Sequence, residues 1–399
     1  MQNHPADQEP RRVLGSFFAP KSENTPTWEQ RKLGEIADFS KGAGYSKNDL
    51  CEEGTPIILY GRLYTKYETC IFDVDTFVKG KAGSVYSKGG EVIVPASGET
   101  AEDISIASVV VQSGILLGGD LNIVSPTDEY DSAFLALTIS SGAAHKYLSS
   151  LAQGKSVVHL HNSDIQSVSA KFPTKREQEE IHSLFEKIDT LITLHQRKYD
   201  KLVNIKKSML DKMFPKNGAS VPEIRFKGFT DPWEQRKLKE IAKEVVRNDP
   251  ASDAPIMMIT AGNGFIEQSD RYAFNNAGES LKKYILLERG ELAYNHGASK
   301  LRPYGSCFAL TTVEKARIPF VYHCFSVEKS NPEFLSIELN GANVENQLRK
   351  IVSSGARMDG LLNISYSEYA EVAVQLPSKE EQDQIAKFFR NLDTLITLH

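Results

Sequence analysis

The sequence predicts an α+β protein in which two similar α/β domains are joined by long antiparallel coiled-coil helices, with the C-terminal helix shortened. Three observations predict this fold. Motifs at the borders of each half recur about 205 residues apart, a period far longer than that of a solenoid repeat. A helix-starting signal follows each half, and apolar residues at helical spacing continue beyond it. The chain has 399 residues, which is also long for one compact domain.

The repeated borders are the strongest signal. Residues 28–33 read WEQRKL and recur unchanged at 233–238, and residues 189–195 read DTLITLH and recur at 393–399. Between these borders the two halves diverge in sequence but keep nearly the same length. We therefore expect the borders to build one shared scaffold, and each interior to form a domain with its own surface.

The end of each half predicts a helix. Thr174 with Glu177, and Ser378 with Glu381, form S/T-x-x-E capping boxes directly after a proline. Apolar residues then follow the three- and four-residue spacing that is typical of a coiled-coil seam. These seam residues are Ile181, Leu184, Ile188, Leu191, Leu202, Ile205 and Met209 in the first copy, and Ile385, Phe388, Leu392 and Leu395 in the second.

The second copy of the seam stops early. The sequence ends at His399, the equivalent of His195, so the second helix is expected to cover only about half of the first. Leu202, Ile205 and Met209 are then expected to be exposed. They would need another protein or self-association with a second copy of this chain, or this end of the helix would fray.

These signals divide the chain into six expected segments. They are a loosely ordered lead (1–27), a first variable domain (28–171), a central spacer helix (172–214), a linker (215–232), a second variable domain (233–375) and a C-terminal helix (376–399).

The composition is that of a globular protein, with 40% hydrophobic and 25% charged residues and a net charge of -5. We see no apolar run of about 18 residues and no secretory signal, so we expect a cytoplasmic chain without a membrane segment. The mildly acidic net charge argues against nonspecific coating of nucleic acid but leaves room for a local basic face.

The sequence shows no motif for chemistry of its own. Residues 153–156 read QGKS, but a P-loop needs glycine where Ser149 stands. We find neither the Asn-Pro-Pro-Tyr motif of adenine methyltransferases nor a dinucleotide-binding glycine motif. His159, His161 and Asp164 lack a fourth ligand for zinc, and the four cysteines lie too far apart for zinc knuckles. We therefore expect no catalytic residue, metal or cofactor in this chain, which is not expected to be an enzyme.

Two variable interiors framed by WEQRKL borders and DTLITLH helices resemble the DNA specificity subunits of type I restriction-modification systems. The resemblance implies that the interiors are target recognition domains that bind double-stranded DNA. It also implies that two DNA adenine-N6 methyltransferase subunits dock on the helices, and that restriction/translocase subunits join them. S-adenosylmethionine, ATP and Mg would then belong to these partner subunits.

Loops rich in glycine and polar groups are the candidates for DNA contact, because base edges are read by amide, hydroxyl and cationic side chains. In the first domain these candidates are Arg62, Tyr64, Lys66, Ser97, Gly98, Thr100, Lys155, Ser156 and His159. In the second they are Asn295, His296, Ser299, Lys300, Arg302, Tyr304, Arg357, Met358 and Asp359. Because the interiors differ, we expect a bipartite and asymmetric target, with the spacer helix setting the unread gap.

Two alternatives stay open. The chain could be a scaffold or adaptor whose domains bind proteins rather than DNA. It could also be a truncated variant of the specificity subunit that donates domains without assembling fully.

Overall fold

The computed structural model describes residues 27–152, 154, 157–216, 218–270, 278–352 and 361–398. The chain divides into two compact units, residues 1–193 and 194–399. Each unit combines sheets with helices, so the α+β fold class is confirmed. The expected loose lead falls, except for Thr27, outside the described residues, as does His399.

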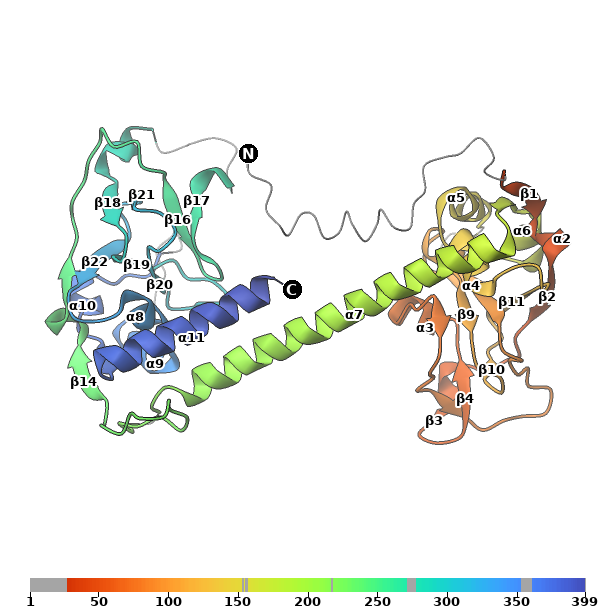
Figure 1. The fold of residues 1–399 in the computed structure, drawn as a ribbon, viewed down its shortest axis with the longest axis horizontal. Coiled ribbons are helices and arrows are strands. Elements are labelled where there is room, and N and C mark those ends of the chain that lie inside the picture. The colour runs from red at the N-terminus through yellow and green to blue at the C-terminus, as the bar shows by residue number, and fades with distance from the viewer. Residues whose placement is uncertain are drawn as a thin grey trace. The chain divides into compact units, whose positions relative to one another are not determined.

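The first unit is built around a sheet in the order β2–β11–β7–β9–β5, in which β5 pairs parallel to β9 and the other neighbours pair antiparallel (Figure 1). A second sheet has the order β10–β4–β6–β3, while β1 pairs with β13 and β8 with β12. The strands are β1 (Glu29–Lys32), β2 (Ala37–Lys41), β3 (Leu50–Cys51), β4 (Thr55–Ile58), β5 (Cys70–Ile71), β6 (Phe77–Val78), β7 (Glu91–Pro95), β8 (Ser97–Gly98), β9 (Ser108–Val110), β10 (Leu116–Leu117), β11 (Leu121–Pro126), β12 (Val158–His159) and β13 (Ser169–Phe172). The helices are α2 (Leu33–Ile36), α3 (Gly61–Thr65), α4 (Ser132–Ile139), α5 (Gly142–Leu151) and α6 (Asn162–Ser167), with short 3-10 turns at Lys47–Asp49 and Asp103–Ser105.

The central strand of this unit is buried on both faces. Val92 and Val94 of β7 belong to the cluster that contains Phe134 of α4, whereas Ile93 belongs to a separate cluster with Ile123 of β11. Because successive side chains on a strand point to opposite faces, a continuous apolar run is needed when both faces are covered.

The second unit repeats this plan with different residues. Its main sheet has the order β15–β22–β19–β20, and β14 pairs with β23, β16 with β17 and β18 with β21. The strands are β14 (Glu234–Lys237), β15 (Ala242–Glu244), β16 (Met257–Thr260), β17 (Gly264–Glu267), β18 (Ile285–Glu288), β19 (Leu292–Asn295), β20 (Ser306–Ala309), β21 (Lys315–Ile318), β22 (His323–Val327) and β23 (Ala373–Leu376). The helices are α8 (Pro332–Leu339), α9 (Ala342–Ile351), α10 (Tyr366–Tyr369) and α11 (Lys379–Thr397), with 3-10 turns at Leu238–Glu240, Gln268–Asp270 and Gly278–Lys283.

The border helices begin where the capping signals predict. Helix α7 spans Lys175–Lys212 and α11 begins at Lys379. The hydroxyls of Thr174 and Ser378 accept from the backbone N–H groups three residues later, at 3.4 and 3.3 Å. The carboxylates of the two boxes have different partners, since Glu177 accepts from the Trp28 indole at 3.1 Å, whereas Glu381 pairs with Arg225.

The same glutamine clamp fixes each variable domain to the helix that follows it. Gln178 of α7 accepts from the backbone N–H of Asp131 at 2.9 Å, and Gln382 of α11 accepts from that of Asn331 at 2.9 Å. Each glutamine also donates to the proline carbonyl just before its helix, at 2.9 Å. Asp131 and Asn331 are the N-caps of α4 and α8, so one buried amide joins two helix starts in each unit.

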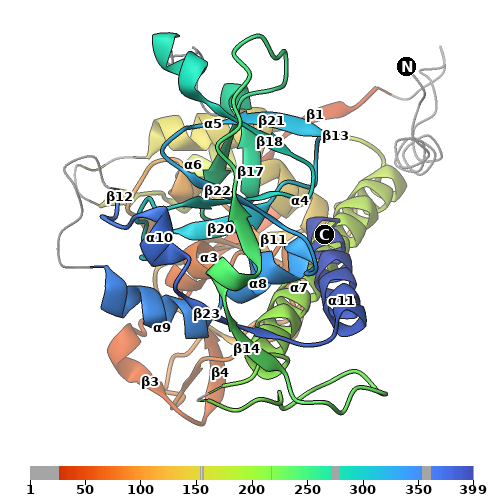
Figure 2. The ribbon, with the colours of Figure 1, turned by 90° about the vertical axis from the view of Figure 1, so that its left-hand side faces the viewer.

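Within the second unit, the C-terminal part of α7 packs against α11. Figure 1 shows α11, in blue, alongside the end of α7, and Figure 2 shows both helices next to α8. Lys206 pairs with Asp393, and Phe214, just after α7, lies 6.2 Å from the Phe389 ring. The later residue on one helix meets the earlier residue on the other, so this helix pair is antiparallel.

This packing corrects one expectation about the seam. Leu202, Ile205 and Met209 are partly buried against the core that contains Ile385 and Leu392, so they are not left exposed for a partner. Ile181 likewise packs on the core of the first unit. Most of the exposed large apolar residues of α7 lie between these two contacts, at Phe185, Ile188, Leu191, Ile192, Leu194 and Tyr199, and Val203 and Leu210 are exposed within the second contact.

Candidate DNA interface

A short strand pair brings two of the predicted loops of the first unit together. Strand β8 pairs antiparallel with β12, so that Ser97 lies opposite His159 and Gly98 opposite Val158. The Ser97 hydroxyl lies 3.2 Å from His159 Nδ1. These strands come from loops about 60 residues apart, and the pairing places an exposed imidazole and a hydroxyl side by side.

The side chain of Tyr64 forms a hydrogen bond with this strand pair. Its hydroxyl donates to the Ser97 carbonyl at 2.9 Å, and burial raises its pKa well above the usual value, so it stays a neutral donor. Gly98 allows the approach, because a Cβ there would lie 2.8 Å from the Tyr64 hydroxyl. Thr100 is exposed and its hydroxyl accepts from the backbone N–H of Asp103 at 3.0 Å.

The two basic candidates near α3 differ in availability. Arg62 is 9% exposed and bonds to Glu68 at 2.6 Å and to Asp75 at 3.1 Å. Such a guanidinium is occupied inside the domain, and its function here is to hold the loop together. Lys66 is 53% exposed and lies 3.9 Å from Glu68, a weak contact that leaves its ammonium group accessible.

An equivalent contact joins two loops in the second unit. Gly297 and Leu361 form an antiparallel bridge just after β19, and the backbone N–H of Leu362 donates to the His296 carbonyl at 2.9 Å. In the first unit the N–H of Leu160 donates to the Ala96 carbonyl at 3.1 Å. The loop after the central strand is therefore tied, in both units, to the chain that returns towards the closing strand.

Asn295 and His296 hold this junction through their side-chain hydrogen bonds. The Asn295 amide donates to the Ile259 carbonyl at 3.1 Å and accepts from the N–H of Gly297 at 2.9 Å. His296 is 6% exposed, and its two ring nitrogens lie 2.8 Å from the Leu362 carbonyl and 2.7 Å from the Val321 carbonyl. Both side chains therefore order the loops from inside.

The loop that follows carries the exposed candidates. Ser299 and Arg302 form a turn in which the Ser299 hydroxyl accepts from the N–H of Arg302 at 3.0 Å, and Lys300 at its tip is exposed. Gly305 closes the loop with φ +81°, and a Cβ there would lie 2.6 Å from the Asn295 carbonyl. This position therefore requires glycine.

Two other candidates in this loop contact the rest of the unit. Arg302 donates to the Asn340 carbonyl at 2.7 Å, and the Arg349 guanidinium lies 5.7 Å from the centre of the Tyr304 ring. The remaining candidates, Lys155, Ser156, Arg357, Met358 and Asp359, lie outside the described residues.

Two residues that anchor the returning segment by side-chain hydrogen bonds were not predicted from the sequence. Asn122 of β11 is fully buried and donates to the Leu160 carbonyl at 2.9 Å, while His323 of β22 lies 2.9 Å through Nε2 from the Ile364 carbonyl. Each of these residues lies on the strand that pairs with the central strand of its unit. Burial lowers the pKa of His323. The available signal was a single polar residue at the start of an apolar strand, in LNIV and HCFSV.

A search of the described residues finds no group of three or more His, Cys, Asp or Glu that could hold a metal ion. In the same part of the chain, no helix is both long enough and apolar enough to cross a membrane.

The fold and the paired loops define a class of protein with two analogous α+β domains, each clamped to a border helix and each carrying a loop junction of its own. Residues 26–204 match the family model described as the type I restriction modification DNA specificity domain. This match covers the first variable domain and most of helix α7, so the resemblance predicted from the border motifs is confirmed over those residues.

Two solved structures align with nearly the whole chain. The S subunit of a type I restriction-modification system from M. genitalium aligns with a TM-score of 0.56 and 13% identity, over 95% of this chain and 92% of that chain. The HsdS subunit from Thermoanaerobacter tengcongensis aligns with a TM-score of 0.44 and 15% identity, over 95% and 92% of the two chains. At such identities the first of these matches supports the fold alone.

Proposed function

We propose that this chain reads a bipartite, asymmetric DNA target, one half-site with each unit. In this proposal the paired loops of each unit enter a groove and contact base edges, while neighbouring cations hold the phosphates. Helix α7, which both units share, sets the number of base pairs left unread. Half-sites about one helical turn apart, roughly 34 Å, would face the same side of the duplex.

The observation that carries this proposal is the duplicated loop junction with different residues. Ala96 with Leu160, and His296 with Leu362, make the same backbone bond in the two units. The groups beside the junction differ, since the first unit offers the partly buried Ser97 and the exposed His159, whereas the second offers the exposed Lys300. Two domains that recognise different DNA sequences need the same backbone arrangement with different side chains at the DNA, and the two units have this combination.

The residues assigned to DNA contact are the exposed ones. In the first unit these are Lys66, Thr100 and His159, together with the partly buried Ser97 beside His159, and in the second they are Ser299 and Lys300. Lys155, Ser156, Arg357, Met358 and Asp359 remain candidates from the sequence. Arg62, Tyr64, Gly98, Asn295, His296, Arg302 and Tyr304 support the loops in this proposal.

Methylation and cleavage are assigned to partner subunits. Two adenine-N6 methyltransferase subunits would carry S-adenosylmethionine, and restriction/translocase subunits would carry ATP and Mg. The exposed apolar residues of α7, including Ile188 at 37% and Leu191 at 55% exposure, offer a docking surface for a methyltransferase. Leu395 of α11, 42% exposed, provides a similar contact in the second unit.

Mapping of methylated adenines tests the bipartite proposal. The chain would be co-expressed with its methyltransferase in a host without adenine methylation, and every modified adenine would be located by sequencing. We expect one split motif with two unlike halves. A contiguous palindrome as the modified site would contradict the proposal.

A binding selection distinguishes a DNA specificity subunit from a protein adaptor. The purified complex would be incubated with random duplexes, and the bound fraction sequenced. A specificity subunit enriches one motif, whereas a protein adaptor leaves the pool unchanged.

A further inference from the structure

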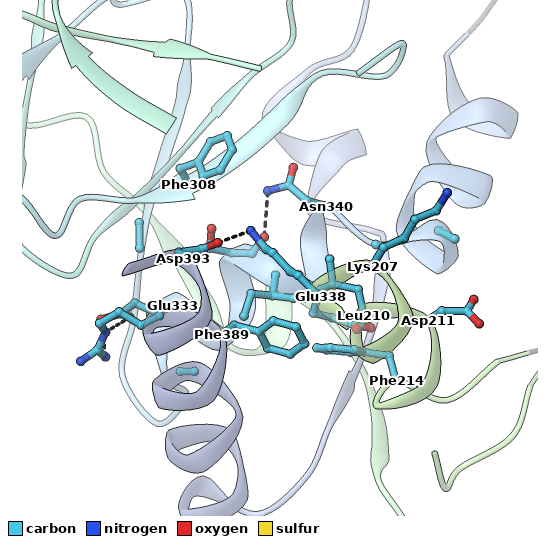
Figure 3. Close-up of a pocket in the computed structure, with 18 of the residues that line it drawn as sticks. Lys207, Leu210, Asp211, Phe214, Phe308, Glu333, Glu338, Asn340, Phe389 and Asp393 are labelled. Carbon is cyan, nitrogen blue, oxygen red and sulfur yellow. Dashed lines mark hydrogen bonds and ion pairs between the residues drawn. The ribbon is translucent and has the colours of Figure 1, made fainter. Parts of the chain in front are cut away.

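The second unit contains a cavity of about 1030 Å³ between the last turns of α7, helix α8 and helix α11 (Figure 3). Leu210, Phe214 and Phe389 form part of its apolar lining. The Phe214 ring stacks on Phe334 at 5.8 Å, which fixes that wall. The volume lies at the upper end of the roughly 300–1,000 Å³ typical of small-molecule sites.

Six of the charged residues that line the cavity form three ion pairs with one another, each exposed or half-exposed. These pairs are Arg390 with Glu333 at 2.8 Å, Lys216 with Asp211 at 2.6 Å, and Lys206 with Asp393. Lys207, Arg302 and Glu345 also line the cavity and are not part of these pairs.

Glu338 differs from these rim acids. It lines the cavity, is 2% exposed, and accepts from the backbone N–H of Gln375 at 3.0 Å. Burial raises its pKa to about 7, against the opposing effect of the Gln375 hydrogen bond, and no cation of the described residues contributes to that shift. A buried carboxylate without a positive partner is costly, and a cation placed beside it would remove much of that cost.

The first unit shows that the scaffold does not need an acid here. Helices α4 and α8 both start from an N-cap that accepts from the N–H three residues later, and Thr138 of α4 occupies the place of Glu338. The Thr138 hydroxyl donates to the Phe134 carbonyl at 2.8 Å. Glu338 therefore has no counterpart in the shared frame, and its carboxyl group is a feature of this cavity.

We propose that the cavity binds an organic ammonium ion, with the charged nitrogen at the Glu338 carboxylate and the apolar body against Leu210, Phe214 and Phe389. An ammonium group supplies the missing positive charge and can donate hydrogen bonds to the carboxylate. The aromatic and aliphatic lining selects ligands that bury carbon next to that charge. An anion of the same shape would meet a like charge and be rejected.

Calorimetric titration of the full chain with phenethylammonium chloride tests the proposal. We expect binding near pH 8, where Glu338 is ionised, and weaker binding near pH 6, where it is largely protonated. Glu338→Gln should lower the affinity on the order of tenfold or more and abolish the pH dependence, because the charged acceptor is gone. Glu338→Thr, which places the α4 residue in α8, should do the same and serves if the Gln variant fails to fold.

Two controls complete the design. Glu333→Gln alters a rim acid and should leave phenethylammonium binding unchanged, and 3-phenylpropionate should not bind the wild-type chain. The proposal is overturned if the wild type does not bind the amine, if both variants at position 338 bind it as tightly as the wild type, or if 3-phenylpropionate binds equally well. DNA is absent from this titration, so its outcome is independent of the proposed function.

Discussion

Removal of the glutamine clamp should destabilise one unit and spare the other. In Gln382→Ala, the backbone N–H of Asn331 and the carbonyl of Pro377 both lose their side-chain partner. The glutamine is 3% exposed, so water reaches these groups poorly. A buried polar group left unsatisfied costs about 1–3 kcal/mol, so the second unit should lose about 2–6 kcal/mol.

Hydrogen exchange of the full chain, followed peptide by peptide, measures this loss in each unit separately. Peptides from α8 and α11 should exchange faster in Gln382→Ala, while peptides from α4 should keep their wild-type rates. Gln178→Ala is the matched control and should give the reverse pattern, because its bonds to Asp131 and Pro173 have the same lengths. Gln382→Met retains most of the volume and should still lose protection, since the hydrogen bonds are what it lacks.

A loss below about 0.5 kcal/mol in Gln382→Ala, the range of an ordinary surface substitution, would refute this reasoning. Equal losses in both units would refute it as well, because the clamp would then not be local to one domain.

Three further outcomes are expected. Lys300→Ala should weaken binding to duplexes by about 1–3 kcal/mol if it reads a base, and only through the second half-site, which competition with half-site-mutated duplexes would show. Leu191→Asp should abolish methyltransferase docking in native mass spectrometry without altering the far-UV circular dichroism, since this side chain is 55% exposed; unaltered docking would remove this residue from the docking surface. Burial raises the pKa of Glu338 from 4.5 to about 7, so the second unit is most stable below the lower value and should lose about 3 kcal/mol as the pH rises through the upper one. Glu338→Gln should flatten this dependence in urea unfolding at about pH 5 and pH 8, and an unchanged slope would argue against the buried acid.

Local signals predicted the helix boundaries well. A proline followed by Thr174 or Ser378 defines where a helix can begin, and α7 and α11 begin one residue after these caps. Repetition of the borders predicted two similar folds because the same contacts must form twice. Neither inference requires knowledge of which residues meet across the chain.

The spacing of apolar residues along the sequence could not predict which of them make tertiary contacts. The seam pattern marks Leu202 and Leu191 alike as apolar, yet Leu202 packs on the core of the second unit and Leu191 is exposed. The sequence places Arg62 in a glycine-containing loop, but it could not show that Glu68 and Asp75 form ion pairs with its guanidinium group. A residue type predicts what a side chain can do, whereas its neighbours decide whether it is free to do so.

The anchoring residues explain how the interiors can diverge while the loop junctions stay alike. Asn122 and His323 occupy equivalent strands and both bond to a carbonyl of the returning segment, although one is an amide and the other an imidazole. At this position the fold requires a hydrogen-bond donor within reach of a backbone carbonyl oxygen, and several types of side chain can provide one. The side chains of the partly buried Ser97 and the exposed Lys300 make no comparable bond to a buried carbonyl in the described structure. In the proposed function, these two residues can therefore change with the DNA sequence to be read, while the junction beside them keeps its geometry.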